Sequence, residues 1–126
     1  MSEITLGIIG GGQLGSMLAI ASKKLNVKTV IFCDDADAPA QNFCNKFIAG
    51  SYDDKEKISE FINQVDLVTY EFENIPFETL NEINKLKPVL PKPSVNRLIQ
   101  HRLAEKDFIN KLNIRTTRYA SIEKKS

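Results

Sequence analysis

Apolar side chains along this chain fall into two kinds of pattern, short uninterrupted runs and longer repeats with helical spacing. The uninterrupted runs predict four strands, at residues 5–10, 28–33, 46–49 and 67–70. These runs do not alternate between apolar and polar positions, as a strand with one face in water would. Strands of this kind are typical of a parallel sheet that is covered on both faces.

The repeats with helical spacing predict four amphipathic helices. The first helix ends near Asn26, and its predicted buried face is Leu14, Met17, Leu18, Ala21 and Leu25. Asp53 caps the second, with Glu56 three residues later, and the buried face is Ile58, Phe61, Ile62 and Val65. Pro76 lies in the first turn of the third, whose apolar side is Phe77, Leu80 and Ile83. Ser94 caps the fourth, which carries Leu98, Ile99, Leu103, Phe108 and Ile109.

The alternation of strands with helices predicts the α/β class. We expect a Rossmann-like parallel sheet with helices on both faces. In such sheets ligands bind beyond the carboxyl ends of the strands. Two of these ends carry unusual residues, namely the glycine-rich loop after the first strand and the sequence YEFEN after the fourth. A binding site is therefore expected where these two segments meet.

Composition and charge narrow the class of protein. The chain has 126 residues, with 42% hydrophobic and 26% charged side chains and a formal net charge of +1. This balance gives no long-range field that would attract nucleic acid or a membrane surface. No signal peptide or membrane span is expected, so the predicted location is the cytoplasm. Cys33 and Cys44 fit no zinc-binding spacing, and two free thiols are expected.

The glycine-rich stretch GIIGGGQLGSM suggests close approach of a ligand to the backbone. Gly10, Gly12 and Gly15 match the pattern G-x-G-x-x-G between a strand and a helix. Gly10 then permits the tight turn, Gly12 lets a phosphate approach, and Gly15 lets the helix pack closely on the strand. The N–H groups at the start of the helix would face an anion. The alternative is a glycine turn whose only role is packing.

One ligand for such a loop is a dinucleotide. Asp34 lies 19 residues beyond Gly15, near the spacing at which dinucleotide-binding folds place a ribose-binding carboxylate. In the sequence CDDADAP, however, Asp34 has the composition of an ordinary turn. Both interpretations of Asp34 stay open on sequence alone.

Two carboxylates after the fourth strand favour a different ligand. Glu71 and Glu73 flank Phe72, and they lie on the same side of the chain if the strand continues through them. Two negative charges would repel a pyrophosphate but would accept hydrogen bonds from an amine. The site therefore suits a ligand with a phosphate at one end and an amino group at the other. The alternative is that one glutamate faces solvent and the other caps the next helix.

Several motifs together resemble one enzyme family. GIIGGGQLGSML, DADAPAQNF, SYDD, DLVTYEFENIP and LIQHRLAEKDFINKLNI occur in this order along the whole chain. They are similar to the N-terminal part of the carboxyaminoimidazole ribonucleotide synthetase family, which consists of ATP-grasp ligases. The resemblance implies that ATP and magnesium convert bicarbonate to carboxyphosphate, which carboxylates the amine of aminoimidazole ribonucleotide. It also implies a cytoplasmic homodimer that acts in purine biosynthesis.

The resemblance implies roles for particular residues as well. Gln13 and Leu14, beside Gly12, would lie against the ribonucleotide, and Glu71, with Glu73, would accept from its amino group. Arg102, in QHRLAEK, matches the arginine that these ligases place on the ATP. Most members have Asp where this chain has His101, so we expect His101 to be a surface residue.

Family members are about three times longer than this chain, which affects what it is expected to do alone. Residues 1–95 correspond to the ribonucleotide-binding pre-ATP-grasp domain, and residues 96–126 to a linker helix and the start of a truncated ATP-grasp domain. No catalytic residue and no metal ligand can be assigned here, so this fragment is expected to be inactive alone. Two alternatives remain, a free-standing Rossmann-type nucleotide-binding module and a structural or dimerisation domain.

Overall fold

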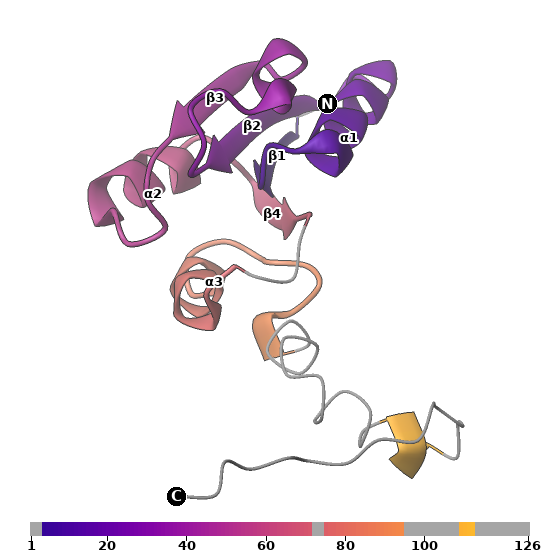
Figure 1. Cartoon of the computed structure of the whole chain (residues 1–126), viewed down its shortest axis with the longest axis vertical. Helices are drawn as coiled ribbons and strands as arrows, with labels where there is room; N and C mark the ends of the chain where they lie inside the picture. The colour runs from indigo at the N-terminus through magenta and orange to yellow at the C-terminus, as the bar shows by residue number, and fades with distance from the viewer. Residues whose placement is uncertain (1–3, 72–74, 95–108, 113–126) are drawn as a thin grey trace, which may run out of the picture.

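The computed structural model describes residues 4–71, 75–94 and 109–112 of the chain (Figure 1). Its elements, in chain order, are β1 (Thr5–Ile9), α1 (Gln13–Lys24), β2 (Lys28–Cys33), the short 3-10 helix η1 (Pro39–Asn42), β3 (Lys46–Ala49), α2 (Lys55–Ile62), β4 (Leu67–Tyr70) and α3 (Phe77–Asn84). All four predicted strands are therefore confirmed, with β1 one residue shorter than expected. The predicted fourth helix lies almost wholly outside the described residues.

The four strands form one parallel sheet in the order β3-β2-β1-β4. In this register Ile9 lies opposite Phe32 on one side and Tyr70 on the other. The carboxyl ends of β1, β2 and β4 consequently meet at one edge of the sheet. This arrangement confirms the Rossmann-like class and brings the glycine loop and the end of β4 together.

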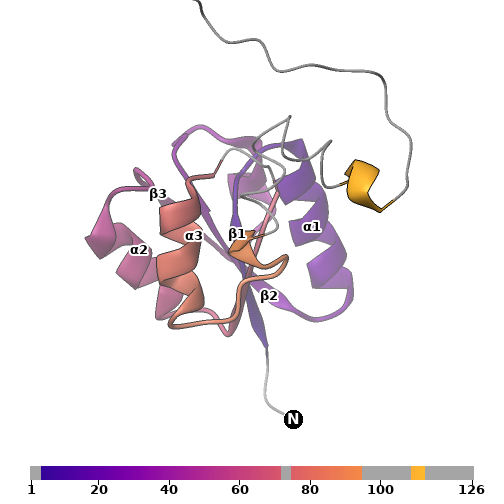
Figure 2. The same cartoon turned by 90° about the horizontal axis from the view of Figure 1, so that it is seen from below.

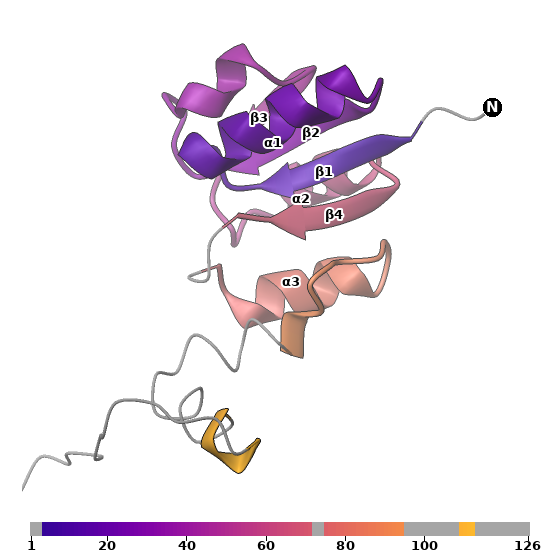
Figure 3. The ribbon, with the colours of Figure 1, turned by 90° about the vertical axis from the view of Figure 1, so that its right-hand side faces the viewer.

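Helices cover both faces of the sheet, as the sequence predicted. Figures 2 and 3 show α1 on one face, and α2 and α3 on the other. The core under α2 and α3 is the larger one and consists of Ile9, Val30, Phe32, Ile48, Phe61, Ile62, Val65, Val68, Ile75, Leu80, Ile83 and Val89. The core on the α1 side is Ile8, Ala19, Ile31, Cys33, Ala38 and Ala40. Alternate residues of β1 and β2 point to opposite cores, as the two-residue period of a strand requires.

The predicted buried face of α1 is wrong. Leu14, Met17, Leu18, Ala21 and Leu25 are all exposed. The residues of α1 that are buried are small, namely Gly15, Ser16, Ala19 and Ser22. Small side chains let α1 pack closely on the sheet, and larger ones would hold it away. The helical period was correct, but the larger apolar residues form the outer face.

Two helix starts also differ in detail from the prediction. Asp54, not Asp53, caps α2, and its side chain accepts a hydrogen bond from the N–H of Lys57. Asp53 instead donates its backbone N–H to the hydroxyl of Ser51 in the preceding turn. Pro76 immediately precedes α3 as its N-cap residue and does not lie within the first turn.

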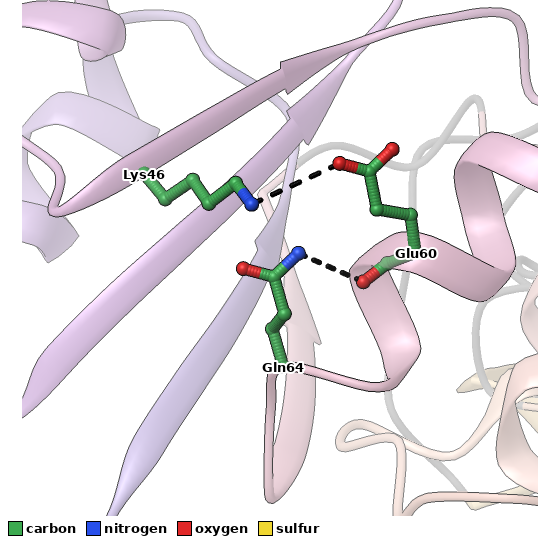
Figure 4. A network of polar contacts seen from close by, with 3 residues as sticks. All are labelled: Lys46, Glu60 and Gln64. Atoms are coloured by element: carbon green, nitrogen blue, oxygen red, sulfur yellow. Dashed lines mark hydrogen bonds and ion pairs between the residues drawn. The ribbon is translucent and has the colours of Figure 1, made fainter.

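Other contacts fix the ends of elements. Asn26 has a φ of 60°, the left-handed conformation that commonly ends a helix, so the predicted end of α1 is confirmed. An ion pair joins β3 to α2, where the ammonium group of Lys46 lies 3.8 Å from the carboxylate of Glu60 (Figure 4). The side-chain amide of Gln64 donates a hydrogen bond to the backbone carbonyl of Glu60. Both charged side chains are about half exposed, so this ion pair contributes little to stability.

Candidate functional site

The glycine loop joins β1 to α1 by a tight turn. Gly10 has a φ of 112°, which side chains other than glycine rarely adopt, and its N–H donates to the carbonyl of Phe32 at 2.8 Å. A Cβ atom at Gly15 would lie only 2.6 Å from the carbonyl oxygen of Gly10. The turn at Gly10 and the close packing at Gly15 are therefore confirmed.

The group that approaches this loop most closely is the side chain of Glu71. The N–H of Glu71 donates to the carbonyl of Ile9 and so extends the pairing of β4 with β1 by one residue. One carboxylate oxygen accepts from the N–H of Gly12 at 2.9 Å, and the other accepts from the N–H of Gly15 at 2.6 Å. The donors that the sequence assigned to a phosphate are thus used by a carboxylate.

The electrostatics of α1 explain why this carboxylate is stable there. The first turn of α1 has no acidic residue, and its N-cap residue Gly12 has no side chain to cap the helix. The free N–H groups and the helix dipole leave partial positive charge at this end. Glu71 supplies the missing acceptor and a negative charge from a neighbouring strand. The bonds are charge-assisted, which makes them stronger than bonds between neutral groups.

Glu71 keeps capacity to bind a ligand. Each carboxylate oxygen can accept about two hydrogen bonds, and the loop uses one on each oxygen. Gln13 and Leu14 follow Gly12 directly and are exposed at the same edge of the sheet. The arrangement therefore presents a fixed acceptor beside two accessible side chains. Glu73, Arg102 and His101 lie outside the described residues.

The sequence of this domain matches a known family. The family model described as "Ribonucleotide synthetase preATP-grasp domain" matches residues 3–100. This range contains the whole sheet, the glycine loop and Glu71. The chain belongs to this preATP-grasp family.

Curated relatives of this preATP-grasp chain are enzymes of purine synthesis. It is 42% identical to the bifunctional purine synthesis protein purC/E of Dictyostelium discoideum over 94% of its own length and 12% of that protein. It is 38% identical to the N5-carboxyaminoimidazole ribonucleotide synthase of Brucella melitensis, over 94% of this chain and 33% of the relative. The chain thus spans a third or less of the length of these relatives.

Solved structures agree with these similarities. The N5-carboxyaminoimidazole ribonucleotide synthetase of Thermus thermophilus superposes with a TM-score of 0.84 at 34% identity, over 88% of this chain and 31% of that one. An Aspergillus clavatus synthase, in complex with ADP and 5-aminoimidazole ribonucleotide, gives a TM-score of 0.78 at 27% identity, over 89% and 30% of the two chains. The fold of this preATP-grasp domain is therefore that of the N5-carboxyaminoimidazole ribonucleotide synthetases.

A hollow at the carboxyl edge of the sheet was not expected from the sequence. It has a volume of about 480 Å³ and is lined by Asp34, Ala36, Ala49, Gly50, Ser51, Tyr52, Asp53 and Pro76. Burial, together with the charge of Asp34, raises the pKa of Tyr52. Most of the residues that line the hollow come from the end of β3 and the loops after β2 and β3, whose sequences resemble ordinary turns, and Pro76 directly precedes α3. Only the shared position of these residues at the carboxyl edge of the sheet could have indicated the hollow.

Asp34 lies in this hollow, but the glycine loop does not suit a dinucleotide. A pyrophosphate at the loop would have to displace or adjoin the carboxylate of Glu71, and like charges at short range repel. Asp35 and Ala38 close a backbone turn after Asp34, as the alternative interpretation of this segment expected. The geometry favours a ligand that donates hydrogen bonds to Glu71.

Among the described residues, no group of three or more His, Cys, Asp or Glu side chains could hold a metal ion. None of the helices in the described ranges is long and apolar enough to cross a bilayer.

Tyr70 lies at the end of β4, and its buried hydroxyl has no hydrogen-bond partner in the part of the chain that the structure describes. Its ring packs against the core under α2 and α3, which is what an aromatic residue in a strand usually indicates.

Both cysteines are free, as the sequence predicted. Cys33 is buried under the loop, where a Cβ at Gly11 would lie 3.2 Å from its sulfur. Burial raises the pKa of the Cys33 thiol, and burial likewise raises the pKa of the half-buried Cys44. Neither thiol is therefore an activated nucleophile, because the reactive form is the thiolate.

These raised pKa values predict a loss of stability at alkaline pH. The unfolded thiols release their protons around pH 9.0, whereas the folded domain retains them to higher pH. The folded state then binds more protons than the unfolded state, so the free energy of unfolding must fall as pH rises above 9. Urea unfolding under reducing conditions at pH 7.5, 9 and 10 measures this fall. A Cys33→Ala variant should show a shallower fall, and an equal slope in both proteins would contradict the prediction.

Proposed function

We propose that this chain is the ribonucleotide-binding domain of an ATP-dependent ligase that carboxylates aminoimidazole ribonucleotide in purine (IMP) biosynthesis. The observation that carries the proposal is the Glu71 carboxylate, which the N–H groups of Gly12 and Gly15 fix at the carboxyl edge of the sheet. A carboxylate held in this way is a ready acceptor for an amino group. The complex of the Aspergillus clavatus synthase with 5-aminoimidazole ribonucleotide supports this choice of ligand.

The proposed reaction has two steps. ATP first phosphorylates bicarbonate, which gives carboxyphosphate and ADP. The exocyclic amine of the ribonucleotide then attacks the carbon of carboxyphosphate, so that a C–N bond forms, phosphate leaves and the amine loses a proton. In this scheme Glu71 accepts a hydrogen bond from the amine and orients its lone pair towards the carbon. Orientation of this kind lowers the entropic part of the barrier.

Other residues have supporting roles in the proposal. Gln13 and Leu14, which are exposed beside Gly12, contact the ribonucleotide. Glu73 is a second acceptor near Glu71, and Arg102 contacts ATP through its planar, permanently charged guanidinium group. We place the ribonucleotide-binding domain at residues 1–95 and the start of the ATP-grasp domain at residues 96–126, since the matched family range ends at residue 100.

The proposal extends to the conditions in which the enzyme works. Magnesium accompanies the ATP, since a divalent ion neutralises phosphoryl charge during transfer. The ATP and the metal are held mainly by polypeptide outside the matched region, which makes up about two thirds of the Brucella relative. The complete ligase is a homodimer in the cytoplasm.

An NMR titration of the chain tests the ligand. Addition of aminoimidazole ribonucleotide should shift the amide resonances of Gly12 and Gly15, because their hydrogen-bond partner Glu71 gains a new donor. NAD serves as the competing ligand, and it should leave both resonances unchanged. If NAD shifts them and the ribonucleotide does not, the chain is a dinucleotide-binding module that uses Asp34 and the adjacent hollow. If neither ligand does, the loop has only a structural role.

A Gly12→Ala substitution should separate binding from folding. The added Cβ would lie 3.0 Å from a carboxylate oxygen of Glu71, which is the end of a flexible side chain. We therefore expect the carboxylate to shift by a few tenths of an ångström while it keeps its hydrogen bonds to the loop, the melting temperature to change little, and ribonucleotide binding to weaken by several-fold. Calorimetric titration and a thermal melt measure the two effects. Gly50→Ala, a loop glycine that faces Lys57, is the control, and equal affinity in both variants would contradict the prediction.

A further inference from the structure

The segment DADAPAQNF, residues 35–43, lies between β2 and β3 and contains η1. It packs against the glycine loop, which comes much earlier in the chain. Ala38 is only 2% exposed, and Ala40 is fully buried. A Cβ atom added at Gly11 would lie 2.8 Å from the Cβ of Ala38, so these two residues are in close contact. The segment therefore meets the loop at the residue that directly precedes Gly12.

A backbone hydrogen bond joins the segment to the loop at the same place. The N–H of Ala40 donates to the carbonyl of Gly11 at 3.0 Å. Ala40 is the second residue of η1, where a helix has no partner of its own for the N–H group. Pro39, the residue before it, has no N–H to offer. Ala40 therefore supplies the first donor of η1, and the loop accepts from it.

This bond acts on the same peptide group that holds Glu71. The carbonyl of Gly11 and the N–H of Gly12 belong to one planar peptide group. That N–H donates to the carboxylate of Glu71 at 2.9 Å. A contact that fixes the carbonyl therefore also sets the direction of the N–H on the opposite side of the group. Hydrogen bonds in series polarise one another, so the bond from Ala40 strengthens the bond to Glu71.

The other groups of the loop are held by α1 itself. The N–H and the hydroxyl of Ser16 both donate to the carbonyl of Gly12, each at 3.0 Å. The second donor to Glu71 is the N–H of Gly15, which lies within α1 and is oriented by that helix. The N–H of Gly12 precedes the helix, so its direction depends on the contact with residues 38–40.

We propose that Ala40 is a positioning residue of the candidate site. Its N–H orients the peptide group between Gly11 and Gly12, and this group holds the carboxylate of Glu71 in place for the amine of the ligand. The inference rests on the proposed function, because it takes Glu71 to be the acceptor for an amine. It also gives a role to DADAPAQNF, to which the proposed function assigns none.

Exchange of a single backbone atom tests this role. Lactic acid in place of alanine replaces the N–H of Ala40 by an oxygen and leaves the side chain unchanged. Cys44 makes such an ester accessible, because a synthetic segment 1–43 can be joined to residues 44–126 by native chemical ligation at this cysteine. The matched control is the same exchange at Ala38, whose N–H donates to the carbonyl of Asp35 at 3.2 Å. The ligated chain without an ester is the reference.

The two esters should differ in binding but not in stability. Each removes one backbone hydrogen bond, so we expect both to lower the melting temperature by a similar amount. Only the ester at Ala40 should move the amide proton resonance of Gly12 upfield, with a smaller movement at Gly15. It should also weaken the binding of aminoimidazole ribonucleotide by several-fold relative to the ester at Ala38. Equal affinities of the two esters, or an unmoved Gly12 resonance, overturn the inference.

A Gly11→Ala substitution tests the same contact if the ester at Ala40 does not fold. The added Cβ would lie 2.8 Å from the Cβ of Ala38 and pushes the segment away from the loop. We expect the same upfield movement of the Gly12 resonance and a several-fold loss of affinity for the ribonucleotide. The double variant Gly11→Ala/Ala38→Gly removes the closest contact and should recover most of that affinity. A double variant that binds no better than Gly11→Ala overturns the inference.

The Gly12 resonance of the free chain distinguishes this inference from the proposed function, because it is measured without ligand. If the reference chain binds no ribonucleotide and the ester at Ala40 still moves the resonance, the proposed ligand is overturned and the positioning of Gly12 by Ala40 is supported. If the reference chain and both esters bind the ribonucleotide equally well, the proposed ligand is supported and the positioning role is overturned.

Discussion

A Gly15→Ala variant of this chain is expected to unfold at a clearly lower urea concentration than the wild type. The added Cβ would lie 2.6 Å from the backbone carbonyl oxygen of Gly10, and a backbone atom cannot move aside as a side chain can. Relief of this contact requires α1 to shift away from β1, and overpacking of this kind typically costs about 1–3 kcal/mol. Equilibrium unfolding followed by circular dichroism measures the loss.

The sign of this effect is what makes the prediction specific. Alanine is the better helix former, so replacement of a glycine in a helix normally stabilises a protein by up to about 1 kcal/mol. Ala21→Gly, at an exposed position of the same helix, is the matched control and should show only the ordinary cost of glycine. If Gly15→Ala were as stable as the wild type or more so, the close packing of α1 on the loop would not constrain the fold.

Most of the fold could be predicted from the sequence because each strand is a short, uninterrupted apolar run. The strands at 28–33, 46–49 and 67–70 have the predicted bounds, since both of their faces are buried and no alternation obscures the pattern. The order β3-β2-β1-β4 could not be derived from such runs, because they carry no information on which strands pair. The parallel direction followed from the uninterrupted apolar runs together with the alternation of strands with helices.

The error on α1 has a physical reason. A period of 3.6 residues shows that a helix has an apolar side, but it does not show which surface that side contacts. Leu14, Met17 and Leu18 obey the period as well as any core residue, yet they are exposed. The actual contact is made by Gly15 and Ala19, whose small size gave no hydrophobic signal. Size complementarity between a helix and a sheet depends on the partner surface, which a single sequence does not reveal.

The candidate site could be predicted only in part. The sequence placed the glycine loop and Glu71 at the same edge of the sheet, and the structure brings them into direct contact. The partner of the loop could not be foreseen, because a phosphate and a carboxylate satisfy the same N–H groups equally well. The anion that the loop binds is the carboxylate of Glu71, which belongs to the chain itself. We therefore place the amine end of the ligand, and not its phosphate, beside the loop.

Glu71→Gln should therefore affect both stability and ribonucleotide binding. A glutamine side chain has one oxygen for the two N–H groups of Gly12 and Gly15, and its own NH2 group would face one of these donors. One charge-assisted bond is lost and a backbone donor is left without its partner, so we expect the free energy of unfolding to fall by about 1–3 kcal/mol. Glu56→Gln removes a carboxylate from the first turn of α2 and is the matched control, with a change below about 0.5 kcal/mol expected at an exposed site of this kind.

The same variant should weaken ribonucleotide binding by more than its loss of stability explains. A neutral amide accepts less strongly from an amine than a carboxylate does, and a loss of about 1–3 kcal/mol corresponds to roughly 5- to 150-fold in affinity. Calorimetric titration well below the melting temperature of each variant separates this effect from unfolding. If Glu71→Gln loses stability but binds the ribonucleotide normally, Glu71 is only a cap for α1. If Glu73→Gln then shows the loss of affinity, the acceptor of the amine is the second carboxylate of YEFEN, which lies two residues beyond the one that the loop holds.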